Sequence, residues 1–470
     1  MKPNSSFLEI QSLYRTGVIS CVDRVLFHLS KIREHQHLNA FLSVYEEEAL
    51  TRAREIDEKI KKGTAGKLAG LIVGLKDVLA YQGHPLQGGS KILDGFISQF
   101  SATAVERLLD ADAIIIGRQN CDEFAMGSSN ENSAFGSVKN PVDPSRVPGG
   151  SSGGSAVAVA AEMCQVALGS DTGGSVRQPA AFCGVVGLKP TYSRISRHGL
   201  IAYGSSFDCI GIFSKRTDDV ALVLEVIAGA DEFDSTVSRK SVPAYSKETA
   251  VTKKFKVSYL REALESDALQ PEIRDAMAEA IAELKSKGHS VEPVEFPLME
   301  YVLPTYYILA TAEASSNLSR YDGVRYGYRS SQTHDLHSLY KKTRSEGFGR
   351  EVQRRILLGT FVLSSSYYDA YYTQAQKVRR LIKDQTNKVL KEYDFMLMPT
   401  APTTAFRLGE HTDNPLEMYL ADLFSVQANV AGVPAISFPY GKDKKGLPIG
   451  LQALAGDFEE IKLLQLAGLL

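Results

Sequence analysis

The sequence predicts an α/β fold, because short buried strands alternate with helices along much of the chain. Residues 71–117 contain a strand, a helix and a second strand, and residues 255–296 repeat that order. This order is typical of parallel sheets, in which loops and catalytic groups lie at the carboxyl edge of the strands. With 470 residues, 44% of them hydrophobic, the chain can form one large domain or two intertwined ones.

The first 65 residues are expected to be mostly helical. Apolar residues recur at helical spacing over residues 7–32, and residues 46–62 form a charged helix that ends at Gly63. We therefore interpret residues 1–65 as an N-terminal helical packing arm and residues 66–470 as the catalytic domain.

A buried strand follows the arm and ends in a lysine. Residues 71–75 are apolar, as in a buried strand, and they lead directly to Lys76. Lysine is rarely buried, so its place at the end of this strand is unexpected. A helix over residues 103–110 and a strand over residues 113–117 complete this first unit.

The middle of the chain alternates short elements with glycine-rich turns. Residues 153–164 are rich in Ala and Val, which suits a helix buried against a sheet, and residues 165–168 form a short strand. A helix begins near Val176, the pattern over residues 189–214 is irregular, and residues 217–228 form a further helix.

The C-terminal part is expected to be helical first and then to return to strands. Residues 299–392 are expected to be largely helical and to lie on the side of the substrate pocket. They contain more than half of the 21 tyrosines. Strands are then expected at residues 395–398, 435–438 and 449–452, with a helix at residues 416–431.

Charge and composition exclude several classes of protein. The net charge of −2 gives no global field that would attract nucleic acid or an anionic membrane. The five cysteines form no CxxC pair, which indicates buried thiols in a reducing compartment rather than a disulfide frame or a zinc site. The N-terminus has no apolar signal segment, and no run of about 18 apolar residues occurs, so we expect a cytoplasmic protein.

Two glycine-rich stretches, residues 147–155 (VPGGSSGGS) and 169–177 (GSDTGGSVR), contain Ser151 and Ser175, 24 residues apart. The first has the GxxxxG spacing of a phosphate loop but lacks the Lys and Ser/Thr that hold phosphate and magnesium. It also matches the GxSxG of a nucleophile elbow, but a proline-broken loop precedes it where the elbow requires a strand. The single Asp-Thr-Gly of the second cannot form an aspartic protease, which needs two facing carboxylates. A further interpretation is that the glycines have no catalytic role and only form tight turns.

Acyl transfer by serine explains these stretches better than tight turns alone. Gly173 and Gly174 would let backbone N–H groups converge beside the Ser175 hydroxyl, as an oxyanion hole requires. The nine histidines are interpreted as surface or structural, which leaves Lys76 as the base. Burial and hydrogen bonds to hydroxyls would have to lower its pKa from about 10.4 to roughly 7 or 8. Lys76 would then take the proton of Ser151, which takes that of Ser175.

Three segments together resemble the amidase signature family. They are residues 75–77 (LKD), 148–155 (PGGSSGGS) and 169–180 (GSDTGGSVRQPA), and the spacing between the two serines also matches. The resemblance implies an α/β/α sandwich around a mixed, mostly parallel central sheet.

The resemblance also assigns roles within the proposed site. It implies that Ser175 is the nucleophile that forms the acyl-enzyme, that Ser151 in a cis peptide is the proton relay, and that Lys76 is the base. The oxyanion hole would consist of the backbone N–H groups of Thr172, Gly173, Gly174 and Ser175.

Within that family the chain is similar to the A subunits of glutamyl-tRNA(Gln)/aspartyl-tRNA(Asn) amidotransferases. The segments that carry this similarity are residues 122–129 (DEFAMGSS), 366–372 (SYYDAYY), 375–379 (AQKVR) and 427–435 (QANVAGVPA). It implies a glutaminase that supplies ammonia for the conversion of Glu-tRNA(Gln), Asp-tRNA(Asn) or both.

The same similarity implies a clamp for the amino-acid end of glutamine. Arg355 would bind the α-carboxylate, Asp422 the α-ammonium group, and Tyr306 would line the pocket. A zwitterion needs opposite charges at a fixed separation, and arginine suits a carboxylate because it can bind it with two parallel hydrogen bonds. Arg354 is adjacent, and helical geometry points the two arginines about 100° apart, so only one can enter the pocket.

Partner subunits are expected to supply the remaining functions. The chain shows no ATP or tRNA motif, so ATP and magnesium are expected in a partner, and no metal or cofactor in this chain. The similarity implies a heterotrimer with B and C subunits, in which the B subunit makes most of the contacts with tRNA. Three alternatives remain: a free-standing amidase that acts on another carboxamide, a non-catalytic scaffold subunit, and a phosphate-binding module.

Overall fold

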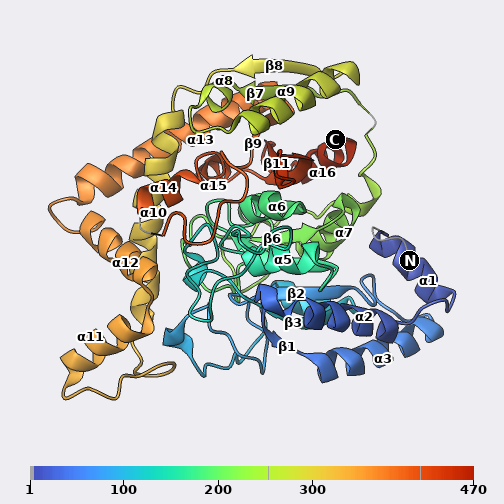
Figure 1. The fold of residues 1–470 in the computed structure, drawn as a ribbon, viewed down its shortest axis with the longest axis horizontal. Helices are drawn as coiled ribbons and strands as arrows, with labels where there is room; N and C mark the ends of the chain where they lie inside the picture. Colours follow the sequence, from blue (N-terminus) through green and yellow to red (C-terminus); the bar gives the residue numbers. More distant parts are fainter. Residues whose placement is uncertain (1–4, 252, 413) are drawn as a thin grey trace.

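An 11-stranded sheet runs through the protein, a computed structural model that describes residues 5–251, 253–412 and 414–470 (Figure 1). The strand order is β1-β3-β2-β4-β6-β5-β10-β11-β9-β7-β8. The strands are β1 (Phe41–Val44), β2 (Ile72–Lys76), β3 (Ile114–Gln119), β4 (Val166–Asp171), β5 (Val186–Lys189), β6 (Cys209–Ser214), β7 (Lys256–Leu260), β8 (Ser290–Val294), β9 (Phe395–Pro399), β10 (Ala435–Lys442) and β11 (Pro448–Leu454).

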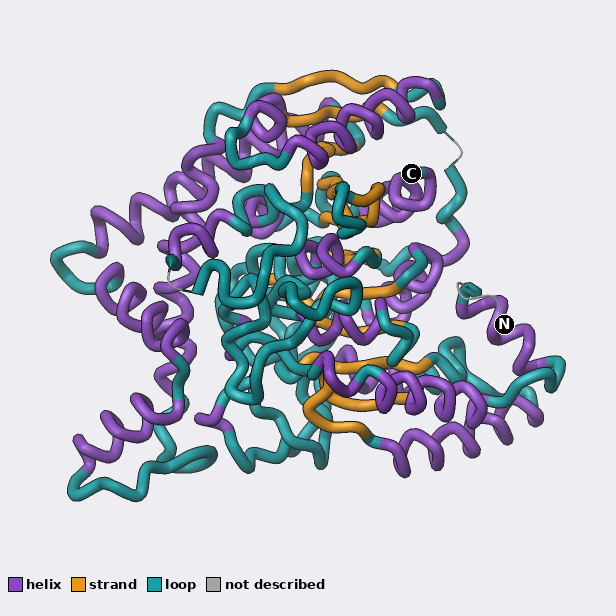
Figure 2. The backbone as a smooth tube through the Cα atoms, viewed as in Figure 1, coloured by secondary structure: helices purple, strands orange, loops and turns teal. Residues whose placement is uncertain are grey.

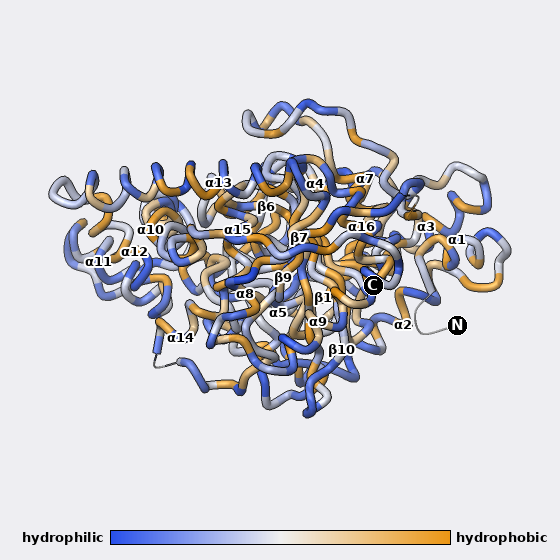
Figure 3. The backbone as a smooth tube through the Cα atoms, turned by 90° about the horizontal axis from the view of Figure 1, so that it is seen from above, coloured by the Kyte–Doolittle hydropathy of each residue, from blue (hydrophilic) through white to orange (hydrophobic). Residues whose placement is uncertain are grey.

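Helices pack on both sides of this sheet. Seen from above, α4, α7 and α13 lie on one side of β6, β7 and β9, and α5 and α9 lie on the other, so the expected α/β/α arrangement is confirmed (Figure 3). The helices are α1 (Phe7–Arg15), α2 (Cys21–Glu34), α3 (Glu46–Lys62), α4 (Thr103–Asp110), α5 (Gly153–Ala160), α6 (Arg177–Cys183), α7 (Thr217–Ile227), α8 (Arg261–Glu265), α9 (Pro271–Ser286), α10 (Met299–Asn317), α11 (Leu336–Gly347), α12 (Arg350–Val362), α13 (Gln374–Glu392), α14 (Pro415–Leu420), α15 (Val426–Ala431) and α16 (Glu460–Leu469).

The sheet is mixed, as expected, but parallel pairs are not its majority. Within the described ranges, β2 pairs in parallel with β3 and β4, and β7 pairs in parallel with β8 and β9. The other six neighbouring pairs are antiparallel. Parallel strands need a long crossover, whereas antiparallel strands can be joined by short turns. The predicted strand–helix–strand units are parallel, and the unpredicted strands β1, β5 and β6 add antiparallel pairs.

The N-terminal arm contributes a strand to the sheet as well as helices. Two helices, α1 and α2, replace the single helical run, because Gly17 takes a positive φ of 70° and a capping box at Ser20 starts α2. β1 then pairs with β3 at the edge of the sheet. The predicted end of α3 at Gly63 is confirmed, with that glycine in the left-handed conformation.

Residues 299–392 contain α10 to α13, and much of this helical region projects from one side of the molecule (Figure 1). Loops gather between it and the strands (Figure 2). The helix predicted at residues 416–431 is instead two short helices, α14 and α15, separated by a turn that carries Asp422. Among the described helices, none combines the length and apolarity needed to cross a membrane.

Candidate active site

Lys76 is buried at the end of β2 and contacts two serines. Its Nζ atom lies 2.7 Å from Ser151 Oγ and 2.9 Å from Ser170 Oγ. β2 and β4 are parallel neighbours, so Lys76 and Ser170 meet at the carboxyl ends of their strands. Burial lowers the pKa of Lys76 to about 8, within the range that a general base at neutral pH requires. Ser170 was not predicted, although it belongs to the second glycine-rich stretch.

Ser151 lies in a tightly packed loop, and the residue before it has to be glycine. The peptide bond between Gly150 and Ser151 is cis. The Gly150 N–H donates to Gln178 Oε1 at 2.9 Å, and the Asp122 N–H donates to the Ser151 carbonyl at 3.1 Å. A Cβ atom on Gly150 would lie 2.1 Å from the Asp122 carboxylate, so a larger residue would displace the loop.

Ser175 lies on the second glycine-rich turn, next to the first. The Ser152 N–H donates to the Ser175 carbonyl oxygen at 3.2 Å, which holds the two stretches side by side. Ser175 is 9% exposed, whereas Lys76 and Ser151 are fully buried. A molecule that enters from solvent therefore meets Ser175 before the other two side chains.

The turn before Ser175 carries the predicted backbone N–H groups, and one of them already has an acceptor. The Gly174 N–H donates to Asp171 Oδ1 at 2.9 Å. In the described part of the chain, the N–H groups of Thr172, Gly173 and Ser175 have no hydrogen-bond acceptor. Thr172, Gly173, Gly174 and Ser175 stay the predicted oxyanion-hole set, in which a buried carboxylate binds the Gly174 N–H group.

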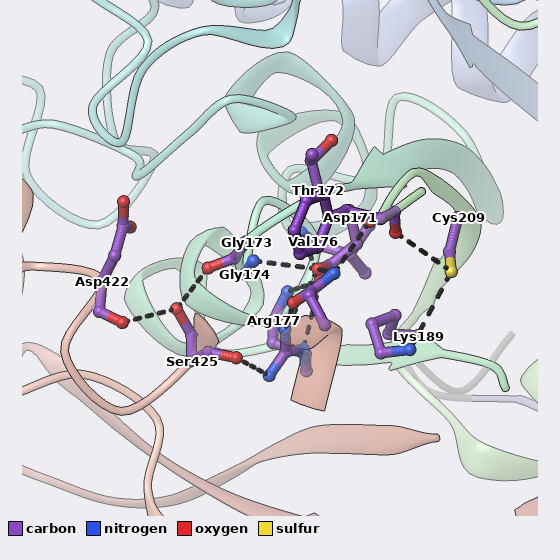
Figure 4. A network of polar contacts seen from close by, with 12 residues as sticks. Asp171, Thr172, Gly173, Gly174, Val176, Arg177, Lys189, Cys209, Asp422 and Ser425 are labelled. Carbon is purple, nitrogen blue, oxygen red and sulfur yellow. Dashed lines mark hydrogen bonds and ion pairs between the residues drawn. The ribbon is translucent and has the colours of Figure 1, made fainter. Parts of the chain in front are cut away.

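A buried ion pair holds this turn in shape (Figure 4). Arg177 binds both carboxylate oxygens of Asp171, at 3.0 and 3.1 Å. Burial alone would raise the pKa of Asp171, but the positive charge of Arg177 lowers it to about 2. Arg177 also donates to the Ser425 carbonyl at 2.7 Å and to Asn429 Oδ1 at 2.6 Å. Ser425 Oγ donates to the Gly173 carbonyl at 2.6 Å. The turn is therefore tied to α15 and the segment before it, from the C-terminal part of the chain.

Replacing Arg177 with methionine is expected to lower the free energy of unfolding by about 3–5 kcal/mol, because it leaves the Asp171 carboxylate buried without its cation. Urea unfolding measures the loss. Arg380→Met is the matched control, since the ion pair of Arg380 with Asp384 is exposed and is expected to contribute less than about 1 kcal/mol. Equal midpoints for the two variants would contradict a structural role for the buried pair.

Arg355 is the arginine of α12 that points into the site. Its side chain is 3% exposed, and it donates from Nη1 to the Tyr203 hydroxyl at 2.7 Å and from Nε to Glu351 Oε1 at 2.8 Å. Arg354 is 37% exposed and pairs with the other oxygen of Glu351 at 2.5 Å. Of the two adjacent arginines, Arg355 is therefore the one that is buried, and it lies against Tyr203.

Asp422 lies close to Arg355, with Tyr307 between them. Its carboxylate accepts hydrogen bonds from Ser128 Oγ at 2.9 Å and from the Tyr307 hydroxyl at 2.7 Å, and burial raises its pKa to about 6. The Arg355 guanidinium lies 5.5 Å from the centre of the Tyr307 ring. Neither Tyr307 nor Ser128 was predicted from the sequence, although Tyr307 follows Tyr306 in the tyrosine-rich region.

Tyr306 joins this polar pocket to the catalytic turn. It is buried on α10, and a Cβ atom on Gly173 would lie 2.4 Å from its ring, so the ring packs directly on the turn. Gln178 makes a second connection, since its Nε2 donates to the Ser128 carbonyl at 2.8 Å. The proposed triad and the proposed clamp therefore form one continuous site. No group of three or more His, Cys, Asp or Glu side chains that could hold a metal occurs among the described residues.

Comparisons with known proteins identify the family of the chain. A family model described as Amidase matches residues 23–464. The chain is 50% identical over 469 residues to a Chlorobium phaeobacteroides protein named as the A subunit of glutamyl-tRNA(Gln) amidotransferase, covering 99% of this chain and 98% of that protein. A Chlorobaculum tepidum protein of the same name is 49% identical over 464 residues, covering 98% and 96%.

Solved structures show the same fold over nearly the whole chain. The A subunit of the glutamyl-tRNA(Gln) amidotransferase of Thermotoga maritima is 39% identical with a TM-score of 0.78, covering 97% of this chain and 94% of that one. The peptide amidase of Stenotrophomonas maltophilia is 28% identical with a TM-score of 0.83, covering 99% and 96%. On the family match and these identities, the chain belongs to the amidase family.

Proposed function

We propose that this chain is the glutamine-hydrolysing A subunit of a tRNA-dependent amidotransferase. The observation that carries the proposal is the pairing of buried Arg355 and Asp422 beside the Ser175 turn. One positive and one negative group at fixed positions suit the zwitterionic end of an amino acid. Tyr306 packs against both Tyr307 and Gly173, which places these groups next to the turn that carries Ser175. The relatives named as A subunits, at about 50% identity, support the same assignment.

In the proposed reaction, Ser175 attacks the side-chain amide carbon of glutamine. Neutral Lys76 takes the proton of Ser151, Ser151 takes that of Ser175, and the new C–O bond leaves the negative charge on the amide oxygen. The N–H groups of Thr172 and Gly173 are free to stabilise that oxyanion. The proton then passes back through Ser151 to the leaving nitrogen, ammonia departs, and the glutamyl ester remains on Ser175.

Water completes the cycle by the same route. It gives a proton to the relay as it attacks the ester, and collapse of the second tetrahedral intermediate returns that proton to Ser175 and releases glutamate. Because the pKa of Lys76 is about 8, a substantial fraction of the lysine is neutral near pH 7.5 and can act as the base.

Asp422→Asn tests the clamp against a free-standing amidase of another specificity. Loss of the negative charge is expected to lower kcat/KM for glutamine about 10–100-fold, since a hydrogen bond to a charged group contributes about 1.5–3 kcal/mol. Butyramide, which has no α-amino or α-carboxylate group, is the matched control substrate, and its kcat/KM should stay within about twofold. Equal losses for both amides would favour the free-standing amidase.

We propose that the ammonia is used in a heterotrimer with B and C subunits. ATP and magnesium would act in the partner, and tRNA would bind mainly to the B subunit. The relatives are named as one lettered subunit of an amidotransferase, which supports a multi-subunit enzyme. Purification of the native assembly, followed by ammonia transfer to Glu-tRNA(Gln) and to Asp-tRNA(Asn), tests this arrangement. Recovery of the chain without partners, and with no transfer to either tRNA, would contradict it.

A further inference from the structure

The turn over residues 203–208 connects the two ends of the site. At one end, the buried Tyr203 hydroxyl accepts the hydrogen bond from Arg355 at 2.7 Å. At the other end, Asp208 Oδ1 accepts a hydrogen bond of 2.6 Å from the Thr172 hydroxyl. The two ends are joined directly, because the Tyr203 N–H donates to Asp208 Oδ2 at 3.0 Å.

This turn is held rigidly from within and from α10. The N–H groups of Phe207 and Asp208 both donate to the Gly204 carbonyl at 2.8 Å. Asn317 of α10 donates to the Tyr203 carbonyl at 3.1 Å, and Glu313 of α10 accepts a hydrogen bond of 2.8 Å from the Ser206 N–H. α10 also carries Tyr306, so the turn, the pocket wall and the clamp share one support.

The sheet fixes the other end of the turn. Asp208 immediately precedes β6, whose first residue, Cys209, pairs with Asp171 at the end of β4. That antiparallel register brings Asp208 beside Thr172, the first residue of the oxyanion turn. A displacement of Arg355 relative to the oxyanion turn would therefore require a distortion of this turn or the loss of the Tyr203 hydrogen bond.

We propose that the 203–208 turn sets the distance between the carboxylate-binding arginine and the oxyanion hole, and that Tyr203 is a specificity-determining positioning residue. The inference rests on the proposed glutamine clamp. Glutamine and asparagine differ by one methylene between the amino-acid end and the amide. A fixed Arg355 places the glutamine amide at Ser175 and leaves the shorter asparagine amide out of reach.

Tyr203→Phe is the direct test in the full chain, because it removes only the hydroxyl that Arg355 binds and that also contacts Tyr306. We expect KM for glutamine to rise about tenfold, a loss of about 1.4 kcal/mol, while kcat stays within about twofold. The preference for glutamine over asparagine in kcat/KM should fall by a similar factor. Hydrolysis of butyramide, which does not use Arg355, should be unchanged.

Tyr245→Phe is the matched control for the loss of a buried arginine–tyrosine hydrogen bond. Tyr245 is fully buried and accepts from Arg194 Nε at 2.8 Å, in a cluster with Glu460 outside the site. Its KM for glutamine should equal that of the wild type. A Tyr203→Phe enzyme with unchanged KM for glutamine, or with equal losses on glutamine and butyramide, would overturn the inference.

A second variant separates the two ends of the turn. Thr172→Val removes the hydroxyl that contacts Asp208, while it leaves Asp208, its bond from the Tyr203 N–H and the Tyr203 hydroxyl in place. We expect a lower kcat on glutamine and butyramide alike, with little change in KM for glutamine. A rise in KM confined to glutamine would overturn the assignment of the two ends. A wild-type enzyme that shows no preference for glutamine over butyramide would instead overturn the proposed function itself.

Discussion

Ser175→Ala is expected to lower glutamine hydrolysis by a factor of about 10⁴ or more, because it removes the atom that forms the acyl-enzyme. Ammonia release from glutamine measures the loss. The fold should be retained, since only the hydroxyl of a 9% exposed side chain is removed. Such a large effect from one oxygen atom distinguishes a nucleophile from a residue that only shapes the pocket.

Ser155→Ala is the matched control for this replacement. Ser155 belongs to the first glycine-rich stretch, is fully buried, and donates to the Leu168 carbonyl at 3.5 Å. Its activity should stay within a few-fold of the wild type. Ammonia release that is the same in the wild type and in Ser175→Ala would favour the non-catalytic scaffold and would contradict the proposed reaction.

Lys76→Met is expected to lower kcat/KM about 10²–10⁴-fold, because general base catalysis contributes about that factor. The pH dependence of the wild type gives an independent test. The neutral amine is the active form, so kcat/KM should rise with pH about tenfold per unit up to about pH 8 and then level off. Asp422, with a pKa of about 6, adds a further loss only below that pH, as its carboxylate becomes protonated.

Lys189→Met controls for the removal of a buried lysine. Lys189 is also fully buried, and its Nζ donates to the Pro190 carbonyl at 2.7 Å outside the triad. The shape of its pH profile should match that of the wild type. A wild-type profile that is flat between pH 6 and 9 would contradict Lys76 as the base.

Much of the fold could be predicted because local patterns determine it. The strand that ends at Lys76 and the helix that ends at Gly63 follow from short runs of sequence, and both are confirmed. β5 and β6 were missed because the chain between Lys189 and Cys209 contains no helix, so no periodicity marks them as a unit. β5 and β6 contribute three of the six antiparallel pairs, and the pairs β1–β3, β10–β11 and β11–β9 contribute the others, so the sheet is less parallel than predicted.

Local sequence patterns likewise predicted one part of the candidate site and not the other. The glycine-rich stretches indicated Ser151 and Ser175, and the end of a buried strand indicated Lys76. The structure places Lys76 against Ser151. The contact between Ser128 and Asp422 joins residues 294 positions apart, and no local pattern encodes such a pairing. The hydrogen bond between Tyr203 and Arg355 likewise depends on how α12 packs, which only the folded chain reveals.

Trapping of the acyl-enzyme tests the central claim most directly. Hydroxylamine competes with water for a glutamyl ester on Ser175, so the wild type should convert glutamine to γ-glutamyl hydroxamate as well as glutamate. Ser175→Ala should form neither product. Continued formation of glutamate by the wild type, with no hydroxamate at any hydroxylamine concentration, would mean that water attacks glutamine directly and would contradict the Ser-Ser-Lys mechanism.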